Sequence, residues 1–544
     1  MNLPTSAPAR RAAQGALVAI LMAGAATAAL AAPRHKAHAP AAAAARDAKL
    51  DAMQAQIDAM RLQMAQMQQA QASAADTRVA ALEQQLAEVN RQLADVTAAQ
   101  TADASDIVTL KTPPVVPSLP NGKLALASAD GRFTANMRAI VMFDTGKYFQ
   151  KDRLPAAVTN RDLNDGSNFR RARFGIDGRL FKDFDYALIY EFGGSGAEDT
   201  GHIQEAWVQY NGLQPLRIKL GAFEPNIGLA AAASTSQMPL LERASPAEVA
   251  RNVAAGDSRS ALQVSANGVW GSGDAGLAAR WLATGAVTGN VVGSFNSAAT
   301  AFGAQPADEQ TALIGRFAVA PFDSTNWQLH LGVNGQLVTQ PNDTGAANAN
   351  RYPVQLRDRP ELRLDGARLV DTGGIDARKA SVLGLEAAAQ AQNFLVESEV
   401  FKYKIDRRNS ALSNPDFNGW YVQGVWVLTG ESRPYNPVEG RFDAPKMTYN
   451  FNPAAGTWGA FELAARYSNL DLNYHRGAPG TLAAADAVRG GQQKVSSIGA
   501  NWYLNPDMRL MLDVLHVDID RYNAAGAQVG QKYNAVALRS QFNF

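Results

Sequence analysis

The sequence predicts an all-β membrane protein, an antiparallel outer-membrane β-barrel of about 16 strands preceded by an N-terminal α-helical coiled coil. Residues 123–544 alternate apolar and polar side chains with a period of two, as in a strand whose two faces meet different surroundings. Residues 47–98 instead repeat apolar side chains at steps of three and four, the pattern of helices that wrap around each other. Past the N-terminal segment, no run approaches the roughly 18 apolar residues of a membrane-spanning helix.

The charge balance and the cysteine content exclude several classes of protein. The 544 residues carry 51 Lys and Arg against 50 Asp and Glu, a net charge of +1. No strongly basic domain is present, so nucleic acid is not an expected partner. The chain has no cysteine, which excludes disulfides, thiolate metal sites and a cysteine nucleophile, and which suits an exported protein.

Residues 1–31 have the pattern of a secretory signal peptide. Arg10 and Arg11 precede the apolar stretch AAQGALVAILMAGAATAALAA, and the small residues Ala29 and Ala31 offer a cleavage site. The alternative is a retained membrane anchor, which the abundance of Ala and Gly disfavours. Residues 32–46 form an Ala-rich segment behind the signal peptide.

Residues 47–98 are predicted to form a coiled coil in two blocks, because a skip between the blocks breaks the heptad register. A Pro-rich linker, residues 99–122, follows with the stretch KTPPVVPSLPNG, whose prolines end the helix and favour extended chain. The apolar heptad positions are Leu50, Met53, Ile57, Met60, Met64 and Met67 in the first block and Val79, Leu82, Leu86, Val89, Leu93 and Val96 in the second.

Residues 123–544 are predicted to be the barrel, and its last stretch, KYNAVALRSQFNF, illustrates the pattern. Val536, Leu538, Phe542 and Phe544 share one face of a strand, whereas Ala537, Arg539, Gln541 and Asn543 share the other. The same alternation runs through RFTANMRAIVMF, FDYALIYEF and WQLHLGVNGQL, which turn-rich stretches separate.

A membrane barrel explains this pattern better than an edge strand or a soluble sandwich. Aromatic residues recur near the ends of the expected strands, where barrels carry girdles at both membrane interfaces, as at Tyr190, Phe192, Trp207, Tyr210, Trp420, Tyr421, Trp502 and Tyr503. An open edge in lipid would leave backbone groups unpaired, so the last strand should close the ring against the first. This region has about 420 residues, enough for about 16 strands around a water-filled lumen.

Five stretches in series resemble the phosphate-selective porin O and P family of bacterial outer membranes. They are FRRARFGIDGRLFKDFDYALIYEF, IQEAWVQYNGLQPLRIKLGAFEPNIGL, WYVQGVWVLTGESRPYN, GAFELAARYSNLDLN and SSIGANWYLNPDMRLMLDVLHV. The resemblance covers residues 123–544. It implies a homotrimer of 16-stranded barrels in the outer membrane of a Gram-negative bacterium. Each lumen would carry arginines that guide anions to a constriction lined by an inward-folded loop, and the coiled coil, which some relatives share, would lie in the periplasm.

Eight arginines are candidates for anion binding in the lumen. Arg171, Arg173 and Arg179 share the polar face of one strand, and charge on the lipid face would cost about 2–4 kcal/mol at mid-membrane. Arginine presents a fork of donors that matches phosphate and carboxylate. The alternative for each arginine is a solvated rim charge or a pair with a barrel carboxylate. The resemblance places lumen arginines at Arg138, Arg170, Arg171, Arg243, Arg357 and Arg359.

The sequence also departs from the family it resembles. Phosphate-selective members carry lysines in the constriction loop, which here reads GLAAAASTSQMPLLERA, and no lysine occurs between Lys219 and Lys379. Glu224 stands where many relatives have lysine. We therefore expect a wider, mildly anion-favouring pore, with outer-membrane lipid around it and phosphate or polyphosphate among the candidate solutes.

No pattern for catalysis, a metal or a cofactor stands out in the sequence. The six histidines do not have the spacing of metal ligands. The sequence also contains no GxSxG nucleophile motif, no HExxH zinc motif and no P-loop. Two function hypotheses remain, and an outer-membrane enzyme is disfavoured. The first is a diffusion channel for small anions. The second is a structural protein whose periplasmic coiled coil tethers or spaces the outer membrane from the cell wall.

Overall fold

The computed structural model describes residues 49–62, 86–97, 116–118 and 124–544, except 152–153, 155–156, 159–161, 195–200, 272–277, 293–307, 323–326 and 346–349. The chain divides into two units, Met1–Thr112 and Pro113–Phe544. None of the helices in these ranges has the length and apolar character to cross a membrane. The predicted signal peptide, residues 1–31, and the Ala-rich segment, residues 32–46, lie outside the described residues.

The first unit contains two helices, residues 49–62 and 86–97, which fall within the two heptad blocks. Ile57, a heptad position, is only 1% exposed. In the second helix, the positions that are not fully exposed are the heptad positions Leu86, Val89, Leu93 and Val96. The least exposed side chains of these helices therefore lie at heptad positions, and their wrapping into a coiled coil stays a prediction.

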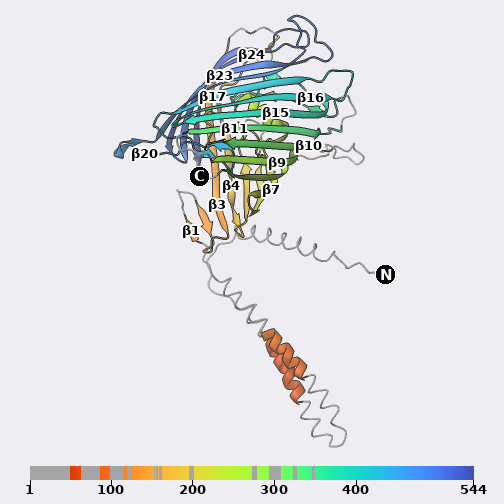
Figure 1. Cartoon of the computed structure of the whole chain (residues 1–544), viewed down its shortest axis with the longest axis vertical. Helices are drawn as coiled ribbons and strands as arrows, with labels where there is room; N and C mark the ends of the chain where they lie inside the picture. Colours follow the sequence, from red (N-terminus) through yellow and green to blue (C-terminus); the bar gives the residue numbers. More distant parts are fainter. Residues whose placement is uncertain are drawn as a thin grey trace, which may run out of the picture. The chain divides into compact units, whose positions relative to one another are not determined.

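The second unit is a closed antiparallel barrel of 16 strands, as the sequence predicts (Figure 1). Each strand pairs with the next along the chain, and β25 pairs with β3 to close the ring. The strands of the ring are β3 (Thr134–Phe149), β4 (Gly166–Leu180), β5 (Phe184–Glu191), β6 (His202–Leu213), β7 (Leu216–Phe223), β8 (Arg259–Trp270), β9 (Ala279–Val291), β10 (Thr311–Ala320), β11 (Trp327–Gln340), β15 (Ile375–Ala391), β16 (Phe394–Arg407), β17 (Asp416–Val427), β22 (Ala460–Tyr474), β23 (Val488–Asn505), β24 (Met508–Asp520) and β25 (Lys532–Asn543).

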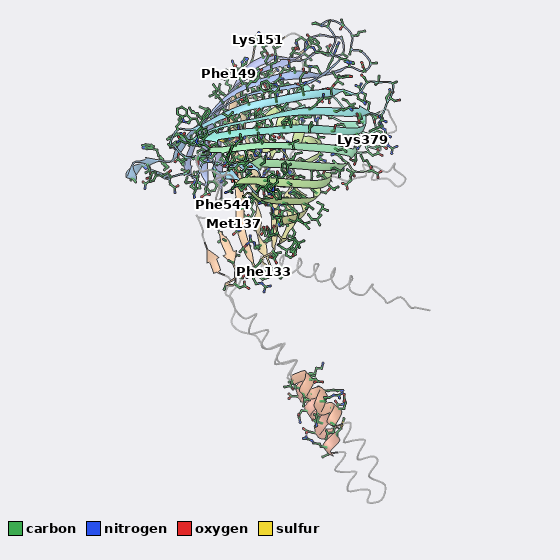
Figure 2. The ribbon with its side chains drawn as sticks, viewed as in Figure 1. Phe133, Met137, Phe149, Lys151, Lys379 and Phe544 are labelled. Carbon is green, nitrogen blue, oxygen red and sulfur yellow. The ribbon has the colours of Figure 1, made fainter. Side chains whose placement is uncertain are left out.

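Along one of its edges, strand β3 pairs with two different strands. Its residues 140–149 pair with β25, and Phe544 exchanges backbone hydrogen bonds of 2.6 and 3.0 Å with Ala139. Its residues 134–136 pair with β2 (Ala125–Ala127), which pairs in turn with β1 (Val116–Ser118). Figure 2 shows Phe133 at one end of β3, Phe149 and Lys151 at the other, and Phe544 between them. Strand β1 lies within the stretch that the sequence assigns to the linker, so part of that stretch joins the sheet.

The two faces of the strands follow the predicted alternation. In β25, Leu538 and Phe542 are 41% and 40% exposed on the outside, whereas Arg539 is fully buried inside. In β11, the apolar Leu331, Val333 and Leu337 are exposed and the polar His330, Asn334 and Gln336 are buried. An outward apolar face and a polar interior are the arrangement that lipid around a barrel requires.

Two long connections and part of a third fold into the barrel, whereas the β20–β21 hairpin of the third, residues 451–458, projects from it (Figure 1). The first, residues 224–258, contains α4 (Leu229–Ala232) and α5 (Ser245–Ala254), and α5 packs against strands that include β11, β16, β17 and β22, across the ring from β7 and β8. The other two connections, residues 341–374 and 428–459, contain β12 (Pro353–Val354), β13 (Arg357–Asp358), β14 (Val370–Asp371), β18 (Tyr435–Asn436), β19 (Arg441–Phe442), β20 (Phe451–Asn452), η4 (Pro453–Ala455) and β21 (Thr457–Trp458).

The hydrophobic core lies inside the barrel, between these connections and the wall that β11–β24 form. Leu241, Ala247 and Val249 of the first connection belong to one buried cluster with Phe401 and Phe417 of that wall. The connections thus fill one side of the lumen, and the cavities described next lie on the side of β3–β8.

Candidate functional site in the lumen

Two cavities meet inside the barrel, and four residues line both of them. The loop-side cavity, of about 880 Å³, is bordered by the connections at residues 224–258 and 341–374. The terminus-side cavity, of about 470 Å³, is bordered by β3, β7 and the end of β25. The shared residues, here called the constriction, are Arg173, Gln204, Arg243 and Asp257.

A β-bulge in β4 places two consecutive arginines in the lumen. Met142 of β3 pairs with Arg171, but the next residue, Phe143, pairs with Phe169, so Arg170 is the extra residue. A bulge re-aims side chains, because two residues on one strand then oppose one on its neighbour. Arg170 and Arg171 both reach the loop-side cavity, while Phe169 stays exposed on the outside.

The first connection supplies two residues of the constriction, and its backbone holds one of them. Arg243 donates from Nε to the carbonyl of Ala230 at 2.9 Å and from Nη2 to the carbonyl of Ala233 at 2.9 Å. These carbonyls lie at the C-terminal end of α4, where a positive charge is favourable. The backbone thus orients Arg243, and no carboxylate of the described residues pairs with it at salt-bridge distance.

Asp257 brings a negative charge to the same narrow point. Its Oδ1 forms an ion pair with Nη2 of Arg251 at 2.8 Å and accepts a hydrogen bond from Nε2 of Gln204 at 3.0 Å. The side chain of Asp257 is 39% exposed. Burial among protein atoms raises the pKa of Asp257, but the positive charges of Arg251, Arg173 and Arg243 outweigh this effect and hold the pKa well below its ordinary value. Asp257 is therefore a carboxylate at neutral pH.

Buried polar contacts fasten the first connection to the barrel wall. Glu399 of β16 accepts the backbone N–H groups of Leu229 and Ala230 at 2.8 and 3.0 Å. Gly228, at φ 72°, permits this approach, since a Cβ there would lie 2.8 Å from the Glu399 carboxylate. Asp513 of β24 accepts the N–H of Leu241 at 2.8 Å.

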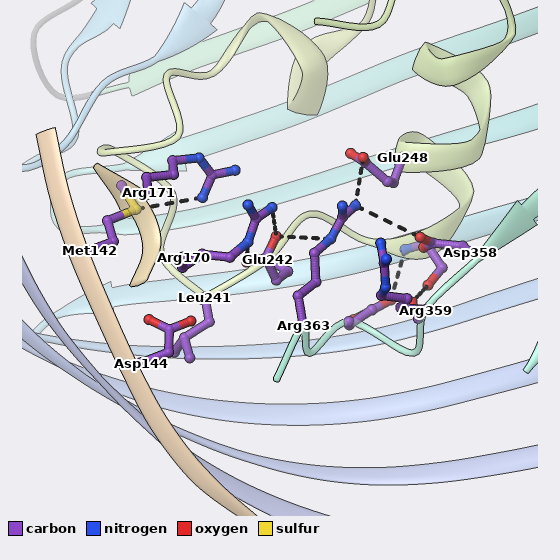
Figure 3. A network of polar contacts seen from close by, with 12 residues as sticks. Met142, Asp144, Arg170, Arg171, Leu241, Glu242, Glu248, Asp358, Arg359 and Arg363 are labelled. Carbon is purple, nitrogen blue, oxygen red and sulfur yellow. Dashed lines mark hydrogen bonds and ion pairs between the residues drawn. The ribbon is translucent and has the colours of Figure 1, made fainter. Parts of the chain in front are cut away.

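A chain of ion pairs links β4 to the connections at residues 224–258 and 341–374 (Figure 3). Arg170 of β4 binds Glu242 with two hydrogen bonds of 2.7 and 3.1 Å. Glu242 also faces Arg363 at 3.5 Å, and Arg363 binds Glu248 at 2.6 Å and approaches Asp358 at 3.8 Å. These charges position the two connections against each other, so they are not free to meet an ion.

The charge of the two cavities differs. Ten arginines and four carboxylates line the loop-side cavity. Five basic residues and four carboxylates line the terminus-side cavity. Among the described residues, Arg171, Arg243, Arg259 and Arg357 line the loop-side cavity without a carboxylate at salt-bridge distance. The loop-side cavity therefore carries an excess of positive charge that its own carboxylates do not cancel.

Seven of the eight arginines proposed from the sequence line a cavity. Arg170, Arg171, Arg173, Arg243, Arg357 and Arg359 border the loop-side cavity, and Arg138 borders the terminus-side cavity. Arg179 borders neither and pairs with Asp185 at 2.9 Å, in line with the alternative of a solvated, paired charge. Arg173 is also paired, with Glu191 at 2.7 Å.

Sequence reasoning missed several basic residues of the cavities. Arg251 lies in α5 and Arg259 begins β8, and no pattern in the sequence singled out either residue. Lys219 follows the period-two pattern of β7, and its Nζ lies 3.9 Å from the centre of the Trp207 ring. The residues missed are Arg251, Arg259, Arg363 and Arg368 in the loop-side cavity and Lys219 and Arg441 in the terminus-side cavity.

The loop without lysines borders the constriction. Ala231, Ala232 and Ala233 line the terminus-side cavity beside Arg243. Glu224 accepts two hydrogen bonds from Arg251, at 2.7 and 2.9 Å. Within the described ranges, no group of three or more His, Asp or Glu side chains is arranged to hold a metal ion.

A 16-stranded barrel with an apolar outer face and inward-folded connections that narrow its lumen is a porin of a Gram-negative outer membrane. The family model for phosphate-selective porin O and P matches residues 145–544, and the chain belongs to that family. Both the family and the fold point to a channel rather than an enzyme.

Two relatives and two solved structures show the range of similarity. Porin O of Pseudomonas aeruginosa is 26% identical over 445 residues, which cover 77% of this chain and 89% of Porin O. An uncharacterized protein of Caulobacter vibrioides is 26% identical over 378 residues, 68% of this chain and 69% of that protein. The anion-selective porin from Comamonas acidovorans matches with a TM-score of 0.44 at 13% identity, covering 76% of this chain and 100% of that one. The channel DcaP of Acinetobacter baumannii matches with a TM-score of 0.41 at 10% identity, covering 77% and 99%.

Proposed function

We propose that this porin is a passive diffusion channel that favours small anions. The observation that carries the proposal is the charge of the loop-side cavity, where ten arginines face four carboxylates. A lumen with a low-dielectric wall focuses such a field and raises the local concentration of ions of opposite sign. Anions that enter this cavity would reach the constriction, where Arg243 has no carboxylate partner among the described residues.

The family description supports phosphate among the solutes, and the constriction argues for weak retention. Arg243 donates from Nε and Nη2 to backbone carbonyls, which leaves Nη1 for an oxyanion, whereas Arg173 donates from Nε to Glu191 and keeps its two terminal nitrogens for one. Arg173 is already engaged by Glu191, and Asp257 repels anions at the same point. No lysine adds a compact positive charge in the neighbouring loop. Phosphate and polyphosphate are therefore candidate solutes that we expect to pass without tight binding, and less readily as their negative charge increases.

The assembly is proposed from the same family membership. Barrels of this class carry their longer loops on the extracellular side, which would place the loop-side cavity at the outer mouth. We propose a homotrimer in the outer membrane, with the N-terminal helices forming a coiled coil in the periplasm. Lipid would contact the exposed apolar faces of the strands.

A comparison of single-channel reversal potentials tests the proposal. Arg357 lines the loop-side cavity with an exposed side chain and no ion pair among the described residues, so Arg357→Ala removes charge without orphaning a carboxylate. The anion-to-cation permeability ratio of the protein should exceed one in a potassium chloride gradient and should fall in Arg357→Ala. The control is Lys404→Ala, which removes one charge from the outside of the barrel, where the side chain is 54% exposed and pairs with Asp406 at 3.3 Å. An equal fall in both variants, or none in either, would refute the assignment.

A further inference from the structure

The constriction combines both signs of charge, and this combination distinguishes it from the cavity that leads to it. Glu191 compensates Arg173 at 2.7 Å, which leaves Arg243 as the constriction's unpaired cation among the described residues. Asp257 contributes a carboxylate and Gln204 an amide. The excess of positive charge in the loop-side cavity therefore ends at the narrow point.

The carboxylate of Asp257 is only partly satisfied by its neighbours. Arg251 and Gln204 both bind Oδ1, so Oδ2 receives neither of these hydrogen bonds. Arg251 also forms ion pairs with Glu224 at 2.7 Å and with Glu248 at 2.9 Å. One guanidinium thus faces three carboxylates, and it cannot neutralise Asp257 alone.

These contacts define the solute that fits. An anion that reaches Arg243 also meets the carboxylate of Asp257 at the same narrow point. Each additional negative charge on the solute therefore adds repulsion from that carboxylate. A hydroxyl or ammonium group on the solute would instead donate a hydrogen bond to Asp257. We infer that the constriction selects small monocarboxylates that carry such a donor, with Arg243 binding the carboxylate and Asp257 accepting from the donor, and that it disfavours multivalent anions. This inference rests on the proposed anion channel.

Bi-ionic reversal potentials test the inference. Potassium chloride on one side would be opposed by potassium lactate, which has a hydroxyl donor, by propionate, which lacks it, or by sulfate, a dianion. In the wild type, lactate should permeate better than propionate, and sulfate worst. In Asp257→Asn, the lactate preference should vanish. The permeability of sulfate relative to propionate should rise about three- to fourfold, the effect of one unit of repulsion at about 5–6 Å in a water-like dielectric.

Two further variants serve as controls for the test. Asp257→Glu retains the charge and should keep the wild-type order of solutes. Asp518→Asn removes a carboxylate from the outer rim, where Asp518 pairs with Lys532 at 2.6 Å, and should change nothing. Heat-modifiable electrophoretic mobility checks that each barrel is folded. Wild-type solute ratios in folded Asp257→Asn, or in a replacement Asp257→Ala if the first does not fold, would overturn the inference while leaving the proposed function intact. A wild type without anion preference in potassium chloride would overturn the proposed function itself.

Discussion

At the scale of single residues, similar arginines in this barrel do different work because their partners differ. Arg170 and Arg171 are consecutive, yet Arg170 is bound by Glu242 and Arg171 has no carboxylate partner among the described residues. Such pairing decides whether an arginine positions a loop or contributes to the field that an ion meets. The number of arginines in the lumen is therefore a poor measure of selectivity, and under the proposed function the unpaired arginines would contribute most of the field.

Adding a lysine to the loop beside the constriction should restore the compact positive charge that this loop lacks. Ala231 lines the terminus-side cavity, and Ala231→Lys would place an ammonium group near Arg243. The anion-to-cation permeability ratio should rise about threefold, the value of one charge at about 6 Å in a water-like dielectric. The chloride current should also become inhibitable by phosphate. The measurement is the reversal potential with phosphate added at fixed ionic strength, because screening would otherwise resemble block.

Ala231→Gln is the matched control for this substitution, because it adds a side chain of similar length without the charge. Phosphate inhibition in both variants would mean that size, and not charge, narrows the path. No inhibition in Ala231→Lys would mean that the loop does not border the route of the ions.

At the scale of elements, the first connection is held in place by the wall rather than by its own helices. Arg539 of β25 binds Asp144 of β3 at 2.6 and 2.7 Å and donates to the carbonyl of Leu241 at 2.6 Å. The same guanidinium reaches Glu242 at 2.9 Å. One buried side chain thus joins the closing strand, the first strand and the connection that forms the constriction.

Removing this guanidinium should loosen the constriction and destabilise the barrel. Arg539→Ala would leave Asp144, 2% exposed, without its partner, and breaking a buried pair from one side costs about 3–5 kcal/mol. We expect a lower temperature of heat-modifiable unfolding and a larger, noisier single-channel conductance. The double variant Asp144→Leu with Arg539→Met removes both charges and should recover part of the thermal stability. Unchanged unfolding and conductance in Arg539→Ala would show that the other anchors suffice.

The helices of the first unit should assemble through their heptad face. A peptide of residues 45–100 should be helical by circular dichroism and should lose helicity on dilution. Replacing Leu86 and Leu93 by Ser should abolish the helicity, because apolar a and d positions provide most of the stability of a coiled coil. Replacing the exposed Ala87 and Ala94 by Ser is the control. A wild-type peptide that stays disordered and monomeric at high concentration would contradict the coiled coil.

At the scale of the whole molecule, the sequence predicted the barrel well because lipid imposes a strict rule on every strand. Outward residues such as Leu538 and Phe542 must be apolar, so a period of two marks each strand. The inward connections obey no such rule. Arg251 lies in the helix α5 and Arg363 in a loop, where the period of two does not apply, and the β4 bulge that turned Arg170 inward broke the parity on which the prediction relied. Ion pairs between segments far apart in the chain, such as Arg539 with Asp144, also leave no mark in a local sequence pattern.

The whole chain should therefore act as a channel whose selectivity comes from a long-range field rather than from a tight binding site. Such a field weakens with ionic strength, since the Debye length falls from about 10 Å at 0.1 M to about 3 Å at 1 M salt. A barrel that served only as a membrane tether would show no steady conductance.

The most direct test is the reversal potential of the purified wild-type porin in a planar bilayer, measured across a threefold potassium chloride gradient centred first near 0.1 M and then near 1 M. We predict steady channels with an anion-to-cation permeability ratio above one at the lower concentration and a ratio that approaches the value for free ions at the higher one. A ratio at or below one near 0.1 M, or a folded barrel that never conducts, would contradict the proposal that the uncompensated arginines of the loop-side cavity set the selectivity.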